Sequence, residues 1–315
     1  MKEFKNFKPS NSKKILFVLP VDEIVQLELN ECLYALAEQE STVDLLVLAK
    51  GLDSDHKDAL GSILKKPSVE RPKGKPQQNQ PMEFEMVSPN GEINYTIEDT
   101  QSDTFGKLFN EAFNYAIVNG YEWFTVVESD DVVAKNYLRY FNTYEKEKKE
   151  FDGFLPLLKE SAPMGFAGFL NEACWVEGFA EVAGTFDLNL LLRFNCMNAT
   201  GCAFKVESVK KYSEEVDGTY KPMKESMKIN YVYEFFLRMV YNDLKFFSIP
   251  RIGYDHRINK TVDNITYFSS KLPLDTVGKD PKNGGLTQPE YKFWMDLAKK
   301  EYFFDNDRKK AYQPA

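Results

Sequence analysis

The opening of the chain limits its fold more than any other stretch, because two apolar runs flank one helical pattern there. Apolar residues dominate Lys13–Val21 and Thr42–Gly51, which is typical of strands buried on both faces. Between them, apolar residues recur at helical spacing, at Ile24, Leu27, Leu29, Cys32, Leu33 and Leu36. A strand, a helix and a strand in this order indicate a parallel pair joined by a right-handed crossover. We therefore expect an α/β fold with a mixed, mainly parallel sheet flanked by helices.

The remainder of the first half continues this alternation after one interruption. A helix begins after Gly51, with Asp53 or Ser54 as its N-cap. Residues 65–92 are rich in proline, lysine and glutamine, so we expect a surface loop there. A strand, an amphipathic helix over residues 102–120 and a strand over Tyr121–Val127 follow. The second half is less regular, but a strong helix and then a strand ending at Asp255-His256-Arg257 are expected after residue 228.

Charge and composition exclude several classes of protein. The net charge of −8 and the absence of a basic, aromatic-rich stripe argue against a nucleic-acid partner. The four cysteines form no CxxC pair, so a zinc knuckle is not expected, and Cys32 is predicted to be a buried apolar residue. Neither a signal peptide nor an apolar run long enough for a transmembrane segment is found. These features indicate a soluble chain in the reducing cytoplasm.

Three carboxylates follow the strand that ends near Val127, in the sequence Glu128-Ser129-Asp130-Asp131. In a parallel sheet, ligands bind beyond the carboxyl ends of the strands. In an extended segment Glu128 and Asp130 would point the same way, and two close carboxylates repel each other. A Mg²⁺ or Mn²⁺ ion that also holds phosphates would remove this cost. The alternative is a solvated loop, with Asp131 as the N-cap of the next helix.

Four segments in this order resemble the GT-A fold nucleotide-sugar glycosyltransferases, specifically glycosyltransferase family 2. They are "ILFVLPV" with its following helix, "VDLLVLAKGLDSD", "FGKLFNEAFNYAIVNGYEWFTVVESDD" with a DXD-type ending, and "YEFFLRMVYNDLKFFSIPRIGYDHR". Together they cover about residues 13–257. The resemblance implies a Rossmann-like GT-A domain over residues 13–265, with a nucleotide-binding half (13–141) and an acceptor-binding half (142–265). Residues 266–315 would form a C-terminal helical tail.

The resemblance also implies site roles and substrates. Pro20 and Val21 would line the nucleoside pocket, Asp53 or Asp55 would lie near the base or ribose, and Asn110 would lie beside the nucleotide. Glu128 would face the ribose or the metal, Asp130 and His256 would bind the metal, and Gly201 would allow close approach of the donor sugar. The donor would be a nucleotide-diphosphate sugar, most simply a UDP-sugar, with Mn²⁺ or Mg²⁺. The acceptor would be a carbohydrate or another hydroxyl-bearing molecule, and the oligomeric state stays open.

The chain departs from the family pattern at three places. Glu128 stands where the family has aspartate, Ala49-Lys50 replace an acidic residue, and Tyr231-Val232 replace a Glu-Asp pair before the Leu-Arg helix. An inverting transfer needs a carboxylate base, for which Glu234 is the leading candidate. Glu234 could instead pair with Arg238, four residues later on the same helix.

Other candidates complete the expected site. Glu225, Asp217 and Glu177 are substitutes for the base. The aromatic side chains of Phe166, Phe169, Trp175 and Phe179 could form an acceptor platform or pack in the core. A catalytically silent GT-A-like domain that binds a nucleotide sugar or serves a structural role is the main alternative. A nucleotidyltransferase is disfavoured because no glycine-rich basic loop follows the first strand.

Overall fold

A computed structural model describes residues 14–73, 83–162, 165–170, 184–185, 191, 197–227, 231–257 and 296, with the backbone alone for 162 and 165–170. The calls for the C-terminal tail, for Trp175 and Phe179 and for Glu177 lie outside these residues. Within the described ranges, no helix has both the length and the apolar character that crossing a membrane requires.

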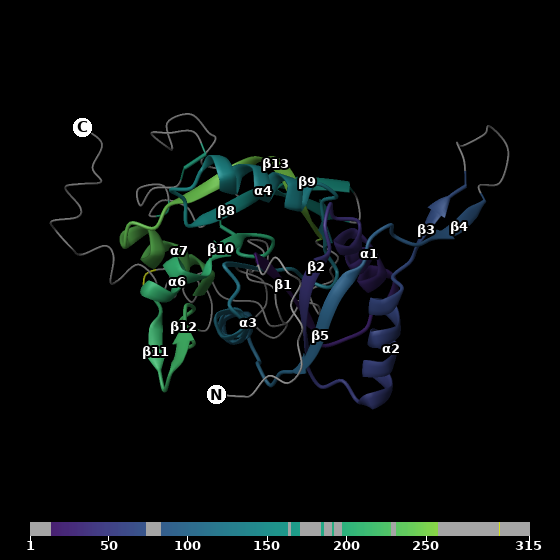
Figure 1. The fold of residues 1–315 in the computed structure, drawn as a ribbon, viewed down its shortest axis with the longest axis horizontal. Helices are drawn as coiled ribbons and strands as arrows, with labels where there is room; N and C mark the ends of the chain where they lie inside the picture. Colours follow the sequence, from purple (N-terminus) through teal and green to yellow (C-terminus); the bar gives the residue numbers. More distant parts are fainter. Residues whose placement is uncertain are drawn as a thin grey trace.

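The described residues form one large sheet with helices on both sides (Figure 1). Its nine strands are β1 (Ile15–Val21), β2 (Val43–Ala49), β5 (Ile93–Asp99), β6 (Trp123–Val126), β7 (Val132–Val133), β8 (Gly153–Ala162), β9 (Gly165–Leu170), β10 (Ala203–Lys205) and β13 (Phe246–Arg257). The helices are α1 (Gln26–Ala37), α2 (Ser54–Lys65), α3 (Phe105–Asn119), α4 (Tyr137–Glu147), α6 (Val206–Lys211) and α7 (Tyr231–Tyr241).

The sheet is parallel in its first half and mixed in its second. Its strand order is β5-β2-β1-β6-β10-β8-β13-β7, with β9 added beside β8. Strands β5, β2, β1 and β6 are parallel neighbours, β10 is antiparallel to β6 and β8, and β13 runs parallel to β8. The predicted mixed, mainly parallel sheet is therefore confirmed.

Alternating side chains of β1 pack into two different hydrophobic cores, one on each face of the sheet. The strand is therefore apolar at every position. Leu16 and Val18 pack into a core with α3 and α7, whereas Phe17 and Leu19 pack with α1, α2 and α4 on the opposite face. Both groups are fully buried. The helical pattern after β1 is confirmed with two exceptions: Ile24 lies before the first residue of α1, and Leu27, in the first turn, is 66% exposed.

The expected surface loop over residues 65–92 contains a small hairpin. Strands β3 (Val69–Pro72) and β4 (Phe84–Val87) pair antiparallel and project from the molecule beside α1 (Figure 1). A second hairpin, β11 (Glu214–Val216) and β12 (Thr219–Lys221), lies next to α3 and α6. Its turn contains Asp217, a substitute for the base, on the exposed tip.

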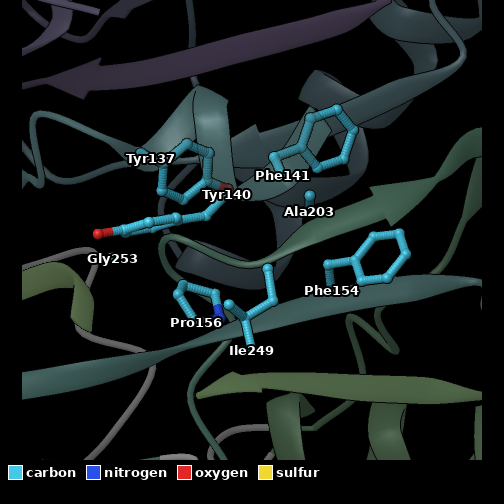
Figure 2. Close-up of a pocket in the computed structure, with 8 residues that line it drawn as sticks. All are labelled: Tyr137, Tyr140, Phe141, Phe154, Pro156, Ala203, Ile249 and Gly253. Carbon is cyan, nitrogen blue, oxygen red and sulfur yellow. The ribbon is translucent and has the colours of Figure 1, made fainter. Parts of the chain in front are cut away.

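A small cavity lies between α4 and the sheet (Figure 2). Tyr137, Tyr140 and Phe141 of α4 line one side, and Pro156 and Ile249 of the sheet line another. Because no charged side chain lines it, the cavity offers nothing to orient a polar ligand, and we treat it as part of the packing beneath α4.

Candidate functional site

The acidic segment lies where the sheet topology predicts a ligand site. Glu128 and Asp131 come from the connection between β6 and β7, beyond the carboxyl end of β6. The end of β13 pairs antiparallel with β7, with Tyr254 opposite Val133 and Asp255 opposite Val132. This pairing brings His256 beside the acids, although 125 positions separate it from Asp131 in the sequence.

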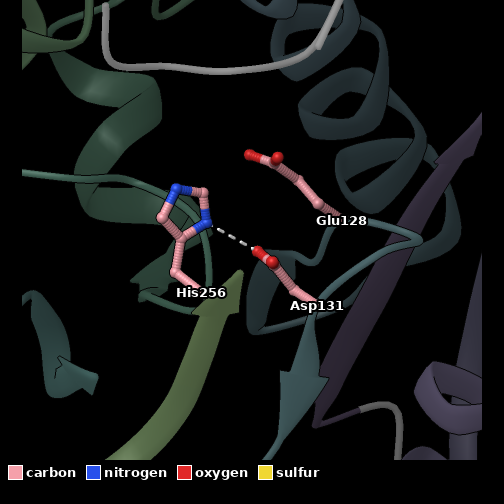
Figure 3. A group of neighbouring side chains, drawn as sticks. All are labelled: Glu128, Asp131 and His256. Atoms are coloured by element: carbon pink, nitrogen blue, oxygen red, sulfur yellow. Dashed lines mark hydrogen bonds and ion pairs between the residues drawn. The ribbon is translucent and has the colours of Figure 1, made fainter. Parts of the chain in front are cut away.

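Glu128, Asp131 and His256 each place a polar atom within 4.8 Å of the others (Figure 3). Nδ1 of His256 lies 2.9 Å from an oxygen of Asp131, and the backbone N–H of Arg257 donates to the other oxygen at 2.8 Å. Glu128 is 3% and Asp131 1% exposed, so both carboxylates are largely withdrawn from water. Buried acids this close together repel each other, and a bound cation would offset that repulsion.

A tight turn, and not an extended segment, arranges these acids. The backbone N–H of Asp131 donates to the carbonyl of Glu128 at 3.1 Å, which folds the segment back on itself. The expectation that side chains alternate from 128 to 130 is therefore wrong, because a turn brings residues i and i+3 together. Asp130 is buried but is not in the group of three, and its role as a metal ligand stays a prediction.

The alternative role for Asp131 as a helix cap is wrong. The next helix, α4, begins at Tyr137 with Asn136 as its N-cap, and β7 lies between that helix and Asp131. Both carboxylate oxygens of Asp131 instead contact β13.

Tyr254 contacts the acidic turn, and Gly201 packs against the Tyr254 ring. The backbone N–H of Glu128 donates to the Tyr254 hydroxyl at 2.9 Å. Gly201 adopts φ +71°, and a Cβ at that position would lie 2.7 Å from the Tyr254 ring. The backbone N–H of Gly201 donates to the Val126 carbonyl at 2.7 Å, and its own carbonyl accepts from Tyr137. The structure thus gives Gly201 a packing role, and its approach to a donor sugar stays a prediction.

The carboxylates of the cluster shift the pKa values of the neighbouring His256 and Tyr254. Burial lowers the pKa of His256, but the charges of Asp131, Glu128 and Glu160 and the hydrogen bond to Asp131 outweigh it and raise that pKa to about 10. Burial, followed by the charges of Asp131 and Glu128, raises the pKa of Tyr254 well above its ordinary value. A proton is thus held on His256 by the same carboxylates that would attract a metal ion.

The donor set of the cluster fits a divalent metal ion. Two carboxylates and an imidazole are ligands that Mn²⁺ accepts, and Mg²⁺ favours the carboxylate oxygens. The buried position of Glu128 and Asp131 in one turn also means that the chain holds them together before any ligand arrives.

Asn110 has a structural partner that the sequence did not reveal. Its side-chain amide donates to the Met223 carbonyl at 2.9 Å and accepts from the Met223 N–H at 2.8 Å. One turn later on α3, Asn114 makes the same two contacts with the backbone of Tyr220. The two asparagines therefore fix residues 220–223 against α3. A role for Asn110 beside the nucleotide is still a prediction.

Glu234 lies in an ion-pair network. Its side chain is 2% exposed and contacts Arg238 at 3.0 Å and Lys224 at 3.3 Å. Arg238 also donates to the carbonyls of Tyr212 and Pro222, so it joins α7 to the segment before it. This geometry matches the helix ion pair expected as the alternative to a catalytic base, and the catalytic role of Glu234 is untested.

The remaining predicted residues lie at the carboxyl end of β1 and at the start of α2. Pro20 and Val21 pair with Leu48 and Ala49 at the carboxyl ends of β1 and β2. Asp53 is the N-cap of α2, as expected, because its side chain accepts from the His56 N–H at 2.9 Å. Asp55 follows in the first turn of that helix. Their nucleotide contacts stay predictions.

The sequence does not reveal the contact of Asp131 with His256 or the support that Tyr254 gives to Glu128. Asp131 continues the acidic run and was a visible candidate, but only the turn shows that it, and not Asp130, lies beside His256. Tyr254 carries no sequence signal, because a tyrosine in a strand is usually a core residue.

No known family model matches the chain, and no curated protein matches it. Solved structures do resemble it. The crystal structure of residues 1–349 of TarS from S. aureus has a TM-score of 0.51 at 15% identity, covering 78% of this chain and 60% of that one. The same TarS fragment in complex with UDP-GlcNAc has a TM-score of 0.52 at 15% identity, covering 79% and 59%. A complex of the fragment with UDP is equally similar, with a TM-score of 0.51.

The chain therefore spans about 60% of the TarS fragment that it matches. At this identity the likeness concerns the fold. Together with the strand order, it shows that the described residues adopt the GT-A fold.

Proposed function

We propose that this protein transfers a sugar, as a hexosyl unit, from a nucleotide-diphosphate sugar to an acceptor hydroxyl with the help of Mn²⁺ or Mg²⁺. The observation that carries the proposal is the grouping of Glu128, Asp131 and His256 within 4.8 Å at the carboxyl edge of a GT-A sheet. The TarS structures with UDP-GlcNAc and UDP support a UDP-sugar as the donor.

Glu128 and His256 would hold the metal ion, with Asp130 as a further candidate ligand, and Asp131 contacts His256. When bound, the ion would neutralise charge on the diphosphate leaving group. The chain contributes a prearranged, largely buried acidic turn, held by the Tyr254 hydroxyl through the backbone of Glu128. The imidazole of His256 would give up a proton to become a ligand, and the nearby carboxylates keep the ring in place.

The base for an inverting transfer is the least supported part of the proposal. Glu234 is 2% exposed and its carboxylate already contacts Arg238 and Lys224, so it is not placed to meet an acceptor hydroxyl. This observation favours the second candidate function, a GT-A domain that binds a nucleotide sugar without turnover. Under that alternative, Tyr231-Val232 in place of an acidic pair removes the base.

An assay of donor consumption distinguishes the two candidate functions. Donor consumption would be measured across a panel of nucleotide sugars with Mn²⁺, with EDTA, and in the variants Glu128→Gln and Glu214→Gln. Glu214 is an exposed acid on the β11–β12 hairpin and serves as the matched control. We expect turnover that EDTA and Glu128→Gln abolish and that Glu214→Gln leaves unchanged.

Thermal-shift measurements with UDP and Mn²⁺ identify the alternative. Stabilisation by the nucleotide and the metal, without consumption of any donor in the presence of a broad acceptor pool, would indicate a binding module. Turnover that is insensitive to both EDTA and Glu128→Gln would refute the metal-dependent mechanism.

A further inference from the structure

Both oxygens of the Asp131 carboxylate already have partners at the end of β13. One oxygen of Asp131 faces Nδ1 of His256 at 2.9 Å, and the other accepts the Arg257 N–H at 2.8 Å. The Asp131 side chain has no exposed surface. Figure 3 shows the Asp131 carboxylate beside one nitrogen of the His256 ring and the Glu128 carboxylate on the same side of that ring.

The contact with Asp131 determines which nitrogen of His256 can bind a ligand. A carboxylate opposite Nδ1 keeps the proton on that nitrogen, because an N–H can donate to it and a lone pair cannot. Once the ring has given up its second proton, Nε2 is therefore the nitrogen with a lone pair to offer. Histidines that bind metals commonly donate their other N–H to a carboxylate in this way, which fixes both tautomer and ring orientation.

The backbone around Asp131 is built to hold this arrangement. The Asp131 N–H closes the turn onto Glu128, and the Arg257 N–H fixes the Asp131 carboxylate to the strand that carries His256. The Arg257 side chain pairs with Glu31 of α1 at 2.6 Å, which anchors the end of β13 to a second element. The end of β13, which carries His256, is therefore tied both to the acidic turn and to α1.

We propose that Asp131 is a positioning residue and not a ligand: it holds His256 through Nδ1 so that Nε2 and Glu128 bind the divalent cation. This inference rests on the metal dependence proposed above. It predicts that Asp131 affects the affinity for the cation only through its contact with His256.

A double-mutant cycle tests this dependence in the full chain. Mn²⁺ affinity would be measured from the electron paramagnetic resonance signal of free Mn²⁺ in the wild type, Asp131→Asn, His256→Ala and the double variant. We expect Asp131→Asn to weaken binding about 10- to 100-fold in the wild type. In the His256→Ala background, the same change should cost less than about 3-fold, because the ring that Asp131 orients is gone.

The control for this cycle is the other histidine of the chain. His56 also contacts an aspartate through Nδ1, at 2.7 Å, but its side chain is 59% exposed. His56→Gln should leave Mn²⁺ affinity unchanged. If Asp131→Asn weakens Mn²⁺ binding equally in both backgrounds, Asp131 is itself a ligand and the inference is overturned.

A measurement on the unmutated protein covers the case in which a variant does not fold. The chain has two histidines, so ring ¹⁵N resonances are readily assigned by comparison with His56→Gln. With Zn²⁺ as a diamagnetic probe, we expect the Nε2 resonance of His256 to shift and Nδ1 to keep its proton. Coordination through Nδ1 would overturn the inference. A wild type that binds neither ion would instead refute the proposed metal dependence, and the inference with it.

Discussion

Replacing Gly201 with alanine tests whether the acidic turn depends on the packing beneath it. Two separate costs are expected. The first is the positive φ of +71°, which disfavours a residue with a Cβ by about 1 kcal/mol. The second is steric, because the new Cβ would lie 2.7 Å from two ring atoms of Tyr254, and overpacking of this kind costs about 1–3 kcal/mol.

Gly218 provides a matched control that separates these costs. It has a similar φ of +75°, but a Cβ there would meet no atom within 4 Å. We expect Gly218→Ala to lower the free energy of unfolding by about 1 kcal/mol and Gly201→Ala to lower it by about 2–4 kcal/mol. Urea unfolding at constant m-value measures both.

The displacement of Tyr254 should also reach the site. The Tyr254 hydroxyl accepts the Glu128 N–H at 2.9 Å, so a shifted ring either breaks this bond or moves Glu128. Gly201→Ala should therefore weaken Mn²⁺ binding, and Gly218→Ala should not. Equal losses of stability for the two alanine variants would refute the reasoning, because the contact with Tyr254 would then cost nothing.

Three further predictions concern groups that are already paired. Glu234→Gln should lower the free energy of unfolding by about 3 kcal/mol, because Arg238 loses a buried partner; a loss of turnover at unchanged stability in urea would indicate the base instead. Asn110→Ala should cost about 2 kcal/mol and speed hydrogen exchange of the Met223 amide, since both backbone groups of Met223 lose their partners. The metal-free protein should lose about 2 kcal/mol of stability between pH 7 and 8.5, because His256 keeps its proton in the folded state, with a pKa of about 10, and loses it in the unfolded chain, with a pKa near 6.5. Its contribution is complete below about pH 6.5 and declines as the pH rises toward 10, so His256→Gln should flatten urea-unfolding data over this window.

The helices and strands of the first half could be predicted because the apolar residues of the sequence are the ones buried in the structure. Strand β1 is apolar throughout, and β2 is apolar except at Asp44, because each face of the sheet meets its own core. Leu27 shows the limit of this reasoning. Its apolar character fits the helical spacing, yet it lies in the first turn of α1 with 66% of its surface exposed.

The candidate site was predictable in its location and only partly in its members. The place of Glu128 beyond a strand end was expected from the sequence pattern, and a role for His256 from the resemblance to the glycosyltransferase family. The structure brings them together because the end of β13 pairs with β7, which follows the acidic turn. The distinction between Asp130 and Asp131 depends on a turn, which strand alternation does not describe. For Asn110 and Glu234, the sequence shows a polar side chain but not its partner, which in each case comes from another segment.

The contacts between Asp131 and the end of β13 bear on how the chain is synthesised. The acidic turn emerges from the ribosome more than a hundred residues before the imidazole and the backbone N–H that complement it. Until β13 is made, the nascent chain holds several carboxylates near each other with their cationic neighbour missing. We therefore expect this edge of the sheet to form only after the end of β13 has left the ribosome.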